Sequence, residues 1–190
     1  MDTSNFNFID KIVAVLRLAK VTRYVIKNDE ILDFGCGSQG YFLKSISKKI
    51  KSGVGLDYDV DDFKVNNLQF FKQKITNKLP FVGEKFNRVF LLAVIEHLPE
   101  KNVNKLFLEF NRVLKKRGCI VLTTPTPFGK IILEFLAYKI HLISEGEIRD
   151  HKKYYSEANL VNLFKKANFK VKIYKKFQFG INSICVAEKK

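Results

Sequence analysis

The sequence predicts an α/β fold, built as a doubly wound and mostly parallel sheet with helices on both faces. Short apolar segments alternate with helix-like segments from residue 30 onward, which is typical of this fold class. Residues 87–92 form a continuous apolar run, as expected for a strand covered on both faces of a sheet. The last two strand-like segments have only residues 176–180 between them. Because that gap is too short for a helical crossover, they are expected to form an antiparallel hairpin.

Seven segments are expected to be strands. In chain order they are residues 30–34, 52–56, 68–72, 87–92, 118–124, 170–175 and 181–187. Two of them end at residues that interrupt a strand, since Gly35 follows the first and Pro125 follows the fifth.

Five segments are expected to be helices. They are residues 6–27, 40–50, 100–114, 129–143 and 156–167. Apolar residues recur at helical spacing in the first and third of these, and Ser156 supplies an N-cap for the last. We interpret the sequence as one domain, residues 1–190, with a leading helix within 1–28 and an insertion at 125–155 that covers a substrate pocket.

Length and composition indicate a domain with a proper hydrophobic core. The chain has 190 residues, of which 46% are hydrophobic and 28% charged, and these values exclude a disordered chain or a small disulfide-stapled fold. Cys36, Cys119 and Cys185 are far apart and form no C-x-x-C pair, which argues against a zinc site. The N-terminal residues lack the pattern of a secretory signal, and no stretch is apolar enough to span a membrane. A cytoplasmic location is therefore expected.

The chain is strongly basic, with 34 Lys and Arg against 19 Asp and Glu and a net charge of +15. Only six of the basic residues are arginine, the side chain best suited to recognising phosphates and bases. High positive charge permits contact with nucleic acid without requiring it. The simpler interpretation is a lysine-rich, solvated surface.

A glycine-rich segment after the first strand carries the clearest functional signal. Gly35, Gly37 and Gly40 stand where a strand turns into a helix, so the backbone can turn sharply and approach a ligand closely. Asp33 would repel a pyrophosphate beside this loop but can bind an ammonium group. Asp57 ends the next strand, 22 positions after Gly35, and can accept hydrogen bonds from both ribose hydroxyls. The implied ligand has a ribose, a carboxylate and an amine, and S-adenosylmethionine fits that description.

These segments resemble the motifs of class I S-adenosylmethionine-dependent methyltransferases, in the type-11 group that includes ubiquinone-biosynthesis-like enzymes. ILDFGCGSQG (31–40) resembles the first motif and VGLDYD (54–59) the second. KLPF (78–81) and FNRVFLLAVIEHLP (86–99) resemble the third and fourth. The resemblance runs from residue 31 to the C-terminus, and it implies the Rossmann-like methyltransferase fold and S-adenosylhomocysteine as the product.

The resemblance implies a set of residues that hold the cofactor. Asp57 would bind the ribose, Tyr58 would lie near the adenine, and the backbone N–H of Ile75 would meet the adenine. Lys74 stands where the family often has an aspartate, and the lost carboxylate is expected to weaken cofactor binding. The whole set is Asp33, Gly35, Cys36, Gly37, Gly40, Asp57, Tyr58, Ile75 and Ala93.

The expected reaction is an in-line transfer of a methyl group to a small-molecule acceptor, at a hydroxyl oxygen. The protein contributes alignment and desolvation. A hydroxyl acceptor also benefits from a general base, for which histidine is the usual residue. His97, which follows the fourth strand, and His151, which follows the insertion, are the candidate bases, with His151 preferred. The fourth strand has no aspartate at its end to help hold Mg²⁺, so no metal is expected.

Other functions stay open at this point. Basic clusters at 44–51, 115–117 and 170–176 fit a methyltransferase that acts on RNA, although they are scattered along the chain. A nicotinamide-dependent oxidoreductase would share the glycine loop, but Asp33 disfavours it. A binding protein that kept the fold without catalysis would tolerate Lys74. The acceptor is otherwise expected to be a sugar-containing or apolar small molecule, and the chain a monomer or homodimer.

Overall fold

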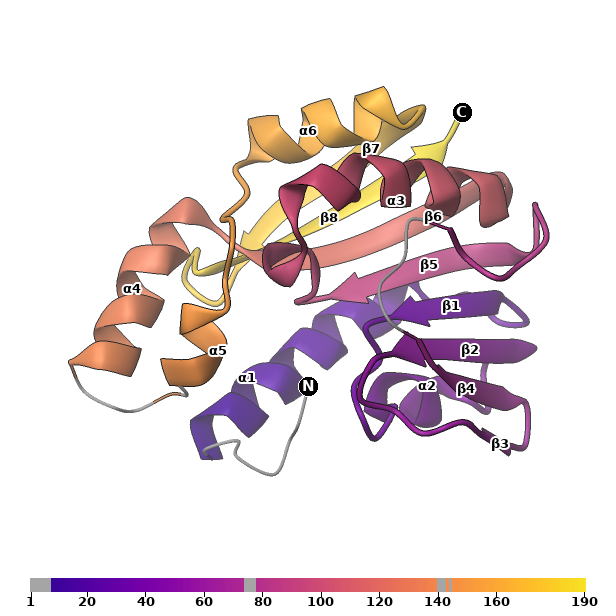
Figure 1. Cartoon of the computed structure of the whole chain (residues 1–190), viewed down its shortest axis with the longest axis horizontal. Helices are drawn as coiled ribbons and strands as arrows, with labels where there is room; N and C mark the ends of the chain where they lie inside the picture. Colours follow the sequence, from indigo (N-terminus) through magenta and orange to yellow (C-terminus); the bar gives the residue numbers. More distant parts are fainter. Residues whose placement is uncertain (1–7, 74–77, 140–142, 144) are drawn as a thin grey trace.

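An eight-stranded sheet forms the centre of the part of the chain that the structure describes (Figure 1). The structure is a computed structural model, and it describes residues 8–73, 78–139, 143 and 145–190. The strands are β1 (Glu30–Phe34), β2 (Ser52–Asp57), β3 (Phe63–Val65), β4 (Leu68–Lys72), β5 (Phe86–Leu92), β6 (Leu114–Pro125), β7 (Phe169–Phe177) and β8 (Asn182–Lys189). Across the sheet they follow the order β3-β4-β2-β1-β5-β6-β8-β7.

The inner strands are parallel, as the alternation of strands and helices predicted. β1 pairs in parallel with β2 and β5, β2 pairs with β4, and β5 pairs with β6. β8 lies antiparallel between β6 and β7. The predicted α/β class, the doubly wound sheet and the C-terminal hairpin are therefore confirmed.

The sheet has one strand more than the seven predicted. The additional strand, β3, pairs antiparallel with β4 at the edge of the sheet, and Asn66 adopts the left-handed conformation in the turn between them. Phe63 stacks on Phe70 with ring centroids 4.4 Å apart. Three residues are too few to show an alternating apolar pattern, so no strand was predicted here.

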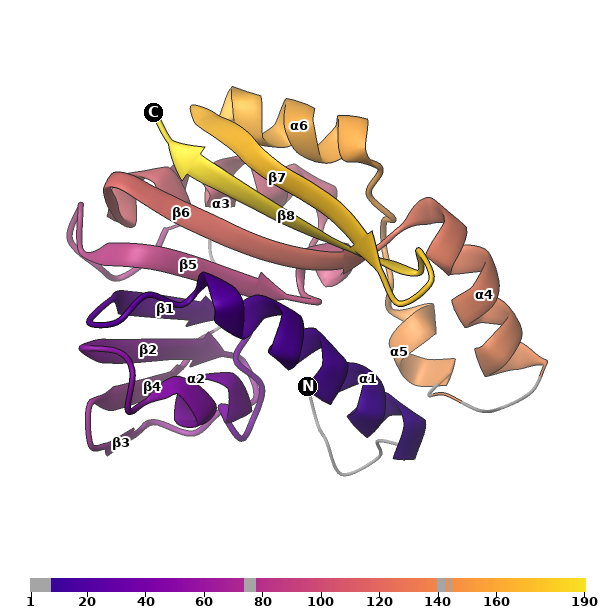
Figure 2. The same cartoon turned by 180° about the vertical axis from the view of Figure 1, so that it is seen from behind.

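Helices cover both faces of the sheet. The helices are α1 (Phe8–Val21), α2 (Tyr41–Ile46), α3 (Glu100–Val113), α4 (Pro127–Tyr138), α5 (Glu145–Arg149) and α6 (Glu157–Lys166). Figure 2 shows α1 and α2 on one face, and Figure 1 shows α3 and α6 on the other. Each face has its own apolar core, one around Phe107 and Phe164 and the other around Phe42 and Phe90. Among the described residues, no helix is both long and apolar enough to cross a membrane.

The segment between β6 and α6 differs from the predicted helix at 129–143. Its first helix, α4, begins at Pro127, because proline lacks only an N–H that the first helical turn leaves unpaired. Thr126 caps the helix, and its hydroxyl accepts a hydrogen bond from the N–H of Gly129 at 2.9 Å. α4 ends at Tyr138, and α5 is a separate helix. The helix predicted at 40–50 is also shorter, since α2 ends at Ile46.

The parallel strands place the loops that follow them along one edge of the sheet. β1 and β2 run in register, with Phe34 opposite Leu56, so the glycine loop after β1 lies beside the segment after β2. β5 pairs with β6 up to Leu92 and Thr123, which brings the end of β5 next to the same edge. Ligands of open α/β sheets bind at this carboxyl edge.

Candidate functional site

The glycine loop has backbone angles and contacts that only glycine tolerates at two of its positions. Gly35 has a φ of +80° and Gly40 a φ of +58°. A Cβ atom on Gly35 would lie 2.3 Å from Cγ2 of Val94, and one on Gly40 would lie 2.1 Å from Cε1 of Phe70. The loop is therefore held tightly against β4 and the segment after β5, and its shape depends on these glycines.

Asp57 joins the end of β2 to the glycine loop. Its Oδ2 accepts a hydrogen bond from the N–H of Gly37 at 2.8 Å, and its Oδ1 accepts one from the N–H of Asp59 at 3.0 Å. The carboxylate is buried at the rim of the loop. Two residues predicted from separate motifs thus form one polar unit.

Asp33 is a buried carboxyl group without a full set of partners. It lies on β1 with 1% of its surface exposed, and its Oδ2 has no hydrogen-bond partner among the described residues. Burial, reinforced by the nearby charge of Asp57, raises the pKa of Asp33 to about 8. A buried polar atom without a partner is costly, and in native proteins it commonly marks a site where a ligand supplies the missing bond.

The remaining predicted cofactor residues that the structure describes lie around the same loop. The N–H groups of Gly35 and Cys36 both donate to the carbonyl oxygen of Leu56, at 2.8 and 3.2 Å. Cys36 is half-buried, and burial raises the pKa of its thiol far above the ordinary value. Tyr58 follows Asp57 and is 60% exposed. Ile75 and the neighbouring Lys74 lie outside the described residues.

Ala93 directly follows β5 and has a left-handed conformation that is uncommon for a residue with a Cβ atom. Its φ is +57°. Its N–H donates to the carbonyl oxygen of Thr123 at 3.0 Å and to the hydroxyl of the same residue at 3.2 Å. This bend turns the chain out of the sheet and into the short 3-10 helix η3 (Ile95–His97).

The structure brings the two predicted bases together, although 54 positions separate His97 from His151 in the sequence. The rings of His97 and His151 pack edge to face with centroids 4.8 Å apart. Their approach is fixed by main-chain bonds, because the N–H groups of Lys152 and Lys153 donate to the carbonyl oxygen of Glu96 at 2.8 and 3.3 Å. These hydrogen bonds hold the segment after α5 against η3.

Glu96 is a third member of this group, and sequence reasoning missed it. Its side chain is fully buried. Its Oε2 accepts a hydrogen bond from the hydroxyl of Thr124 at 3.0 Å, whereas its Oε1 has no partner in the described part of the chain. Burial raises the pKa of this carboxyl group. The sequence signal that could have pointed to Glu96 is its position, because it is an ionisable residue between the apolar run 89–95 and His97.

Both histidines are held by a second side chain. Nδ1 of His97 lies 3.0 Å from Oδ2 of Asp150, and its Nε2 is buried with no partner in the described structure. Nδ1 of His151 lies 2.9 Å from the hydroxyl of Tyr154. Burial and the neighbouring His97 lower the pKa of His151 to about 4, so its imidazole is neutral at pH 7.

The glycine loop and this second group share one edge of the sheet. Val94, which fills the space against Gly35, stands two residues before Glu96. Thr123 and Thr124 are consecutive on β6, and the first contacts Ala93 while the second contacts Glu96. A ligand in the glycine loop would therefore have the histidine group as its neighbour along the rim.

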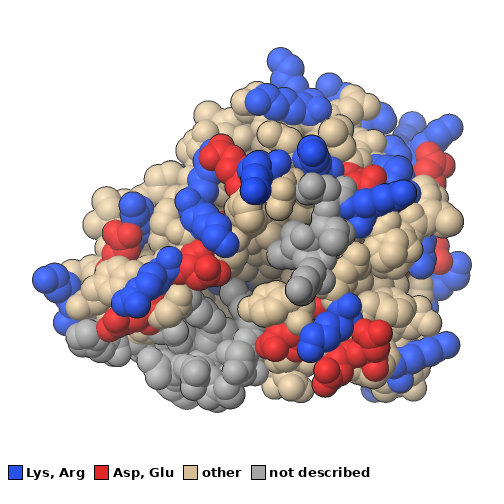
Figure 3. Space-filling view, in the orientation of Figure 1, with Lys and Arg blue, Asp and Glu red and all other residues tan. Residues whose placement is uncertain are grey.

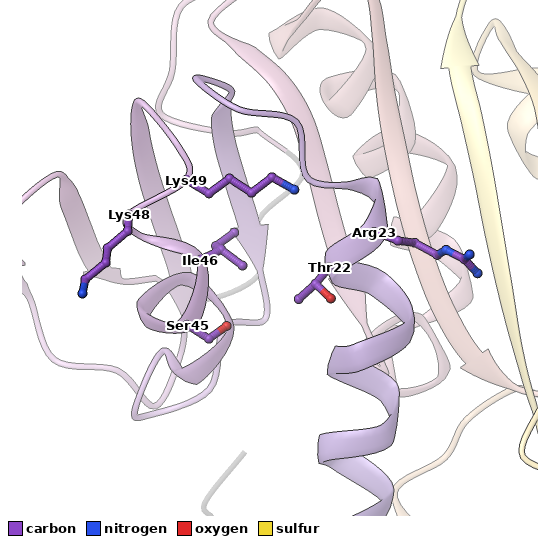
Figure 4. Close-up of a pocket in the computed structure, with 6 residues that line it drawn as sticks. All are labelled: Thr22, Arg23, Ser45, Ile46, Lys48 and Lys49. Atoms are coloured by element: carbon purple, nitrogen blue, oxygen red, sulfur yellow. The ribbon is translucent and has the colours of Figure 1, made fainter.

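Two other surface features lie apart from this edge. A pocket of about 410 Å³ opens between α2 and the 3-10 turn η2 (Thr22–Tyr24), and none of the predicted site residues lines it. Figure 4 shows Thr22 across it from Ser45 and Ile46, with Arg23 directed away from them. On the face in Figure 3, lysine and arginine side chains are spread among acidic ones instead of forming one stripe.

Comparison with solved structures supports the fold. A chain in the complex between the Haloferax volcanii Trm112 methyltransferase activator and a methyltransferase matches with a TM-score of 0.70 and 16% identity, covering 92% of this chain and 88% of that one. An S-adenosylmethionine-dependent methyltransferase from Methanosarcina mazei matches with a TM-score of 0.66 and 20% identity, over 90% and 96% of the two chains. CalO1, a methyltransferase of calicheamicin biosynthesis with S-adenosylhomocysteine bound, matches with a TM-score of 0.70 and 14% identity, over 96% and 55%.

Comparison of sequences gives a relative and a family. The tRNA U34 carboxymethyltransferase of Nautilia profundicola is 28% identical over 109 residues, which are 52% of this chain and only 35% of that protein. A family model described as a methyltransferase domain matches residues 7–172. Since that match includes the glycine loop, β1 to β6 and the histidine group, the chain belongs to the S-adenosylmethionine-dependent methyltransferases of class I.

Proposed function

We propose that the chain transfers the methyl group of S-adenosylmethionine to a hydroxyl oxygen of a small-molecule acceptor. The observation that carries this proposal is the neutral His151 packed on His97 at the same edge as the glycine loop. A hydroxyl group loses its proton when it is methylated, and an imidazole that is neutral at pH 7 is suited to accept that proton.

The residues around the loop fit the cofactor. Asp33 has a buried oxygen without a partner, which suits the ammonium group of the amino-acid part. Asp57 would bind the ribose, and Tyr58, Cys36, Ala93 and the N–H of Ile75 would surround the rest. The glycines leave no room for a side chain, so the backbone can lie directly against the ligand. When bound, S-adenosylmethionine would supply a methyl group carried on a cationic sulfur, and the sulfur would become a neutral thioether as the acceptor oxygen takes that methyl group.

The segment 125–155 is proposed to cover the acceptor. It brings His151 against η3 through the main-chain bonds to Glu96. α4 within this segment exposes an apolar face that would adjoin an apolar acceptor. This face is formed by Phe128, Ile131, Phe135 and Tyr138. In this arrangement His151 is the proposed base. His97, whose ring is held by Asp150, packs against the ring of His151 and fixes its position.

The cofactor part of the proposal is tested by calorimetry with S-adenosylhomocysteine. The unmodified chain should bind it and should not bind NADH. Asp57→Ala should weaken binding roughly tenfold or more, because the ribose hydroxyls and the N–H of Gly37 lose their acceptor. Asp59→Ala, which removes an exposed carboxylate two residues later, should leave the affinity unchanged. Unchanged affinity in Asp57→Ala would contradict this assignment.

The acceptor part is tested with radiolabelled S-adenosylmethionine and a panel of hydroxylated small molecules, sugar-containing and apolar. His151→Ala should lower the rate of label transfer while the affinity for S-adenosylhomocysteine stays at the wild-type value. A transfer rate that His151→Ala and His97→Ala leave unchanged would show that neither histidine removes a proton.

RNA is the second candidate acceptor, and the likeness to a tRNA U34 carboxymethyltransferase favours it. The net charge of +15 would assist such binding. Filter binding of tRNA across a series of salt concentrations decides between the two acceptors. A steep loss of tRNA affinity with rising salt, together with label transfer to tRNA, would support RNA as the acceptor. Weak tRNA binding that does not change with salt would favour the small-molecule acceptor.

A further inference from the structure

We propose that Glu96, His97 and His151 bind a divalent first-row transition-metal ion such as Zn²⁺. One donor atom from each of the three side chains lies within 4.8 Å of the others. Two imidazoles and one carboxylate form a ligand set that suits such an ion, whereas Mg²⁺ and Ca²⁺ prefer oxygen ligands alone. This inference concerns binding only, so it does not depend on which acceptor the chain methylates.

The first argument is that each side chain has one atom engaged by the protein and another left for an ion. Among the described residues, Glu96 uses Oε2 for Thr124 and leaves Oε1 without a hydrogen-bond partner. In the same part of the chain, His97 uses Nδ1 for Asp150 and leaves its buried Nε2 without one. His151 uses Nδ1 for Tyr154, so Nε2 is its second ring nitrogen.

The outer partners are those expected around a metal site. A metal-binding imidazole usually donates its other N–H to a carboxylate or another acceptor, which fixes the tautomer and the orientation of the ring. Asp150 has that place beside His97 at 3.0 Å, and Tyr154 lies beside His151 at 2.9 Å. A ring held in this way points one defined nitrogen toward the other two side chains.

The second argument is electrostatic. The carboxyl group of Glu96 is fully buried. A carboxylate in such a place is costly to ionise, and a dication beside it would hold it in the charged form.

The site would tighten on binding. Zinc lies about 2.0–2.2 Å from nitrogen and oxygen ligands, so the ligand atoms around it are roughly 3–3.6 Å apart. The three side chains would therefore move inward by about 1 Å from their present spacing. Three protein ligands leave a coordination position open, as in catalytic zinc sites.

The sequence led to the opposite expectation, that no metal binds. Ala93 provides no carboxylate at the end of β5, and no close pair of cysteines or histidines is present. The third ligand, His151, comes from the C-terminal end of the 125–155 segment, and the bonds from Lys152 and Lys153 to Glu96 bring it into range. This part rests on the proposed function: with the ion bound, Nε2 of His151 is a ligand and cannot also accept a proton, so the ion would instead lower the pKa of an acceptor hydroxyl bound at the open position.

The test is a titration of the full chain with Zn²⁺ after treatment with a chelator, followed by calorimetry. One ion per chain should bind. His97→Ala, His151→Ala and Glu96→Gln should each weaken binding at least about tenfold, and Glu157→Gln, which changes an exposed carboxylate on α6, should not. The visible spectrum of bound Co²⁺ should change in the same three variants, because it reports the nitrogen and oxygen ligands.

Binding of S-adenosylhomocysteine is measured in every variant. Wild-type affinity for it shows that the variant is folded and that the cofactor site is intact, independently of the metal. If no ion binds, or if the three variants bind Zn²⁺ as tightly as the wild type, the cluster is a hydrogen-bonded group and the metal proposal is wrong. Failure of S-adenosylhomocysteine to bind the wild type would instead contradict the cofactor assignment.

Discussion

Three residues of the candidate site have buried polar atoms that form no hydrogen bond within the described part of the chain. These residues are Asp33, Glu96 and His97. Such atoms reduce stability, and a protein retains them where a ligand completes their bonding. Asp33 was predicted from its place before the glycine loop. Glu96 was not, because its importance depends on contacts with Thr124 and with histidines from two segments, which no local pattern shows.

Asp33→Asn should make the ligand-free chain more stable above neutral pH. The folded state raises the pKa of Asp33 from 3.8 to about 8. Between these values the unfolded chain has lost the proton and the folded chain still holds it, so this residue makes the fold progressively less stable as pH rises. Each pKa unit corresponds to about 1.4 kcal/mol, so removal of the titrating group gains up to several kcal/mol near pH 8.

Thermal melts of Asp33→Asn and wild type between pH 5 and 9 measure this effect. The difference in melting temperature should grow up to about pH 8 and then level off. The same variant should bind S-adenosylhomocysteine more weakly, because the ammonium group loses its carboxylate. A difference that stays constant with pH would show that Asp33 does not titrate in this range.

Gly35→Ala should destabilise the chain by about 2 kcal/mol or more. The new methyl group would lie 2.3 Å from Val94, and the φ of +80° disfavours any residue with a Cβ. Gly83→Ala is the matched control, since its new methyl group would lie 3.4 Å from the carbonyl oxygen of Arg112 and its φ is not positive. Urea unfolding of both variants gives the comparison, and equal losses would refute the steric explanation.

Helices and strands were predictable where their patterns were long, and less so at their ends. β5 and α3 were found because apolar residues run continuously or recur at helical spacing over many positions. β3 was missed because three residues carry no period. The start of α4 was placed too late because Pro127 was interpreted as the end of the preceding strand and not as the first residue of a helix.

Ser156→Ala should cost about 1 kcal/mol through the N-terminus of α6. The hydroxyl of Ser156 accepts a hydrogen bond from the N–H of Asn159 at 3.2 Å, and the side chain of Asn159 accepts one from the N–H of Ser156 at 3.1 Å. Ser47→Ala, at the C-terminal end of α2, is the control and should change the free energy of unfolding by less than about 0.5 kcal/mol. Equal effects in chemical unfolding would show that the cap contributes nothing specific.

At the scale of the whole molecule, the sequence predicted the order of layers but not the meeting of distant segments. The doubly wound sheet follows from alternation along the chain, so the carboxyl edge and its glycine loop could be foreseen. The pairing of η3 with the segment after α5 could not, because it depends on main-chain bonds over more than 50 positions.

The excess positive charge should make stability depend on salt. The net charge is +15, and repulsion between like charges weakens a compact state. Raising NaCl from about 20 to 200 mM shortens the screening length, so the melting temperature should rise. Exchange of the exposed Lys48 and Lys49 for glutamate lowers the charge by two per exchange, to +11, and should reduce that rise. A melting temperature that is independent of salt in both proteins would contradict this account.

The bonds from Lys152 and Lys153 to Glu96 have a consequence for how such a chain can diverge. Under the proposed function, they make the side of the sheet edge proposed to meet the acceptor conditional on the docking of one inserted segment, whereas the side proposed to meet the nucleoside is built from the sheet itself. Changes of length or composition between β6 and α6 can thus exchange one acceptor chemistry for another, with the donor side left as it was.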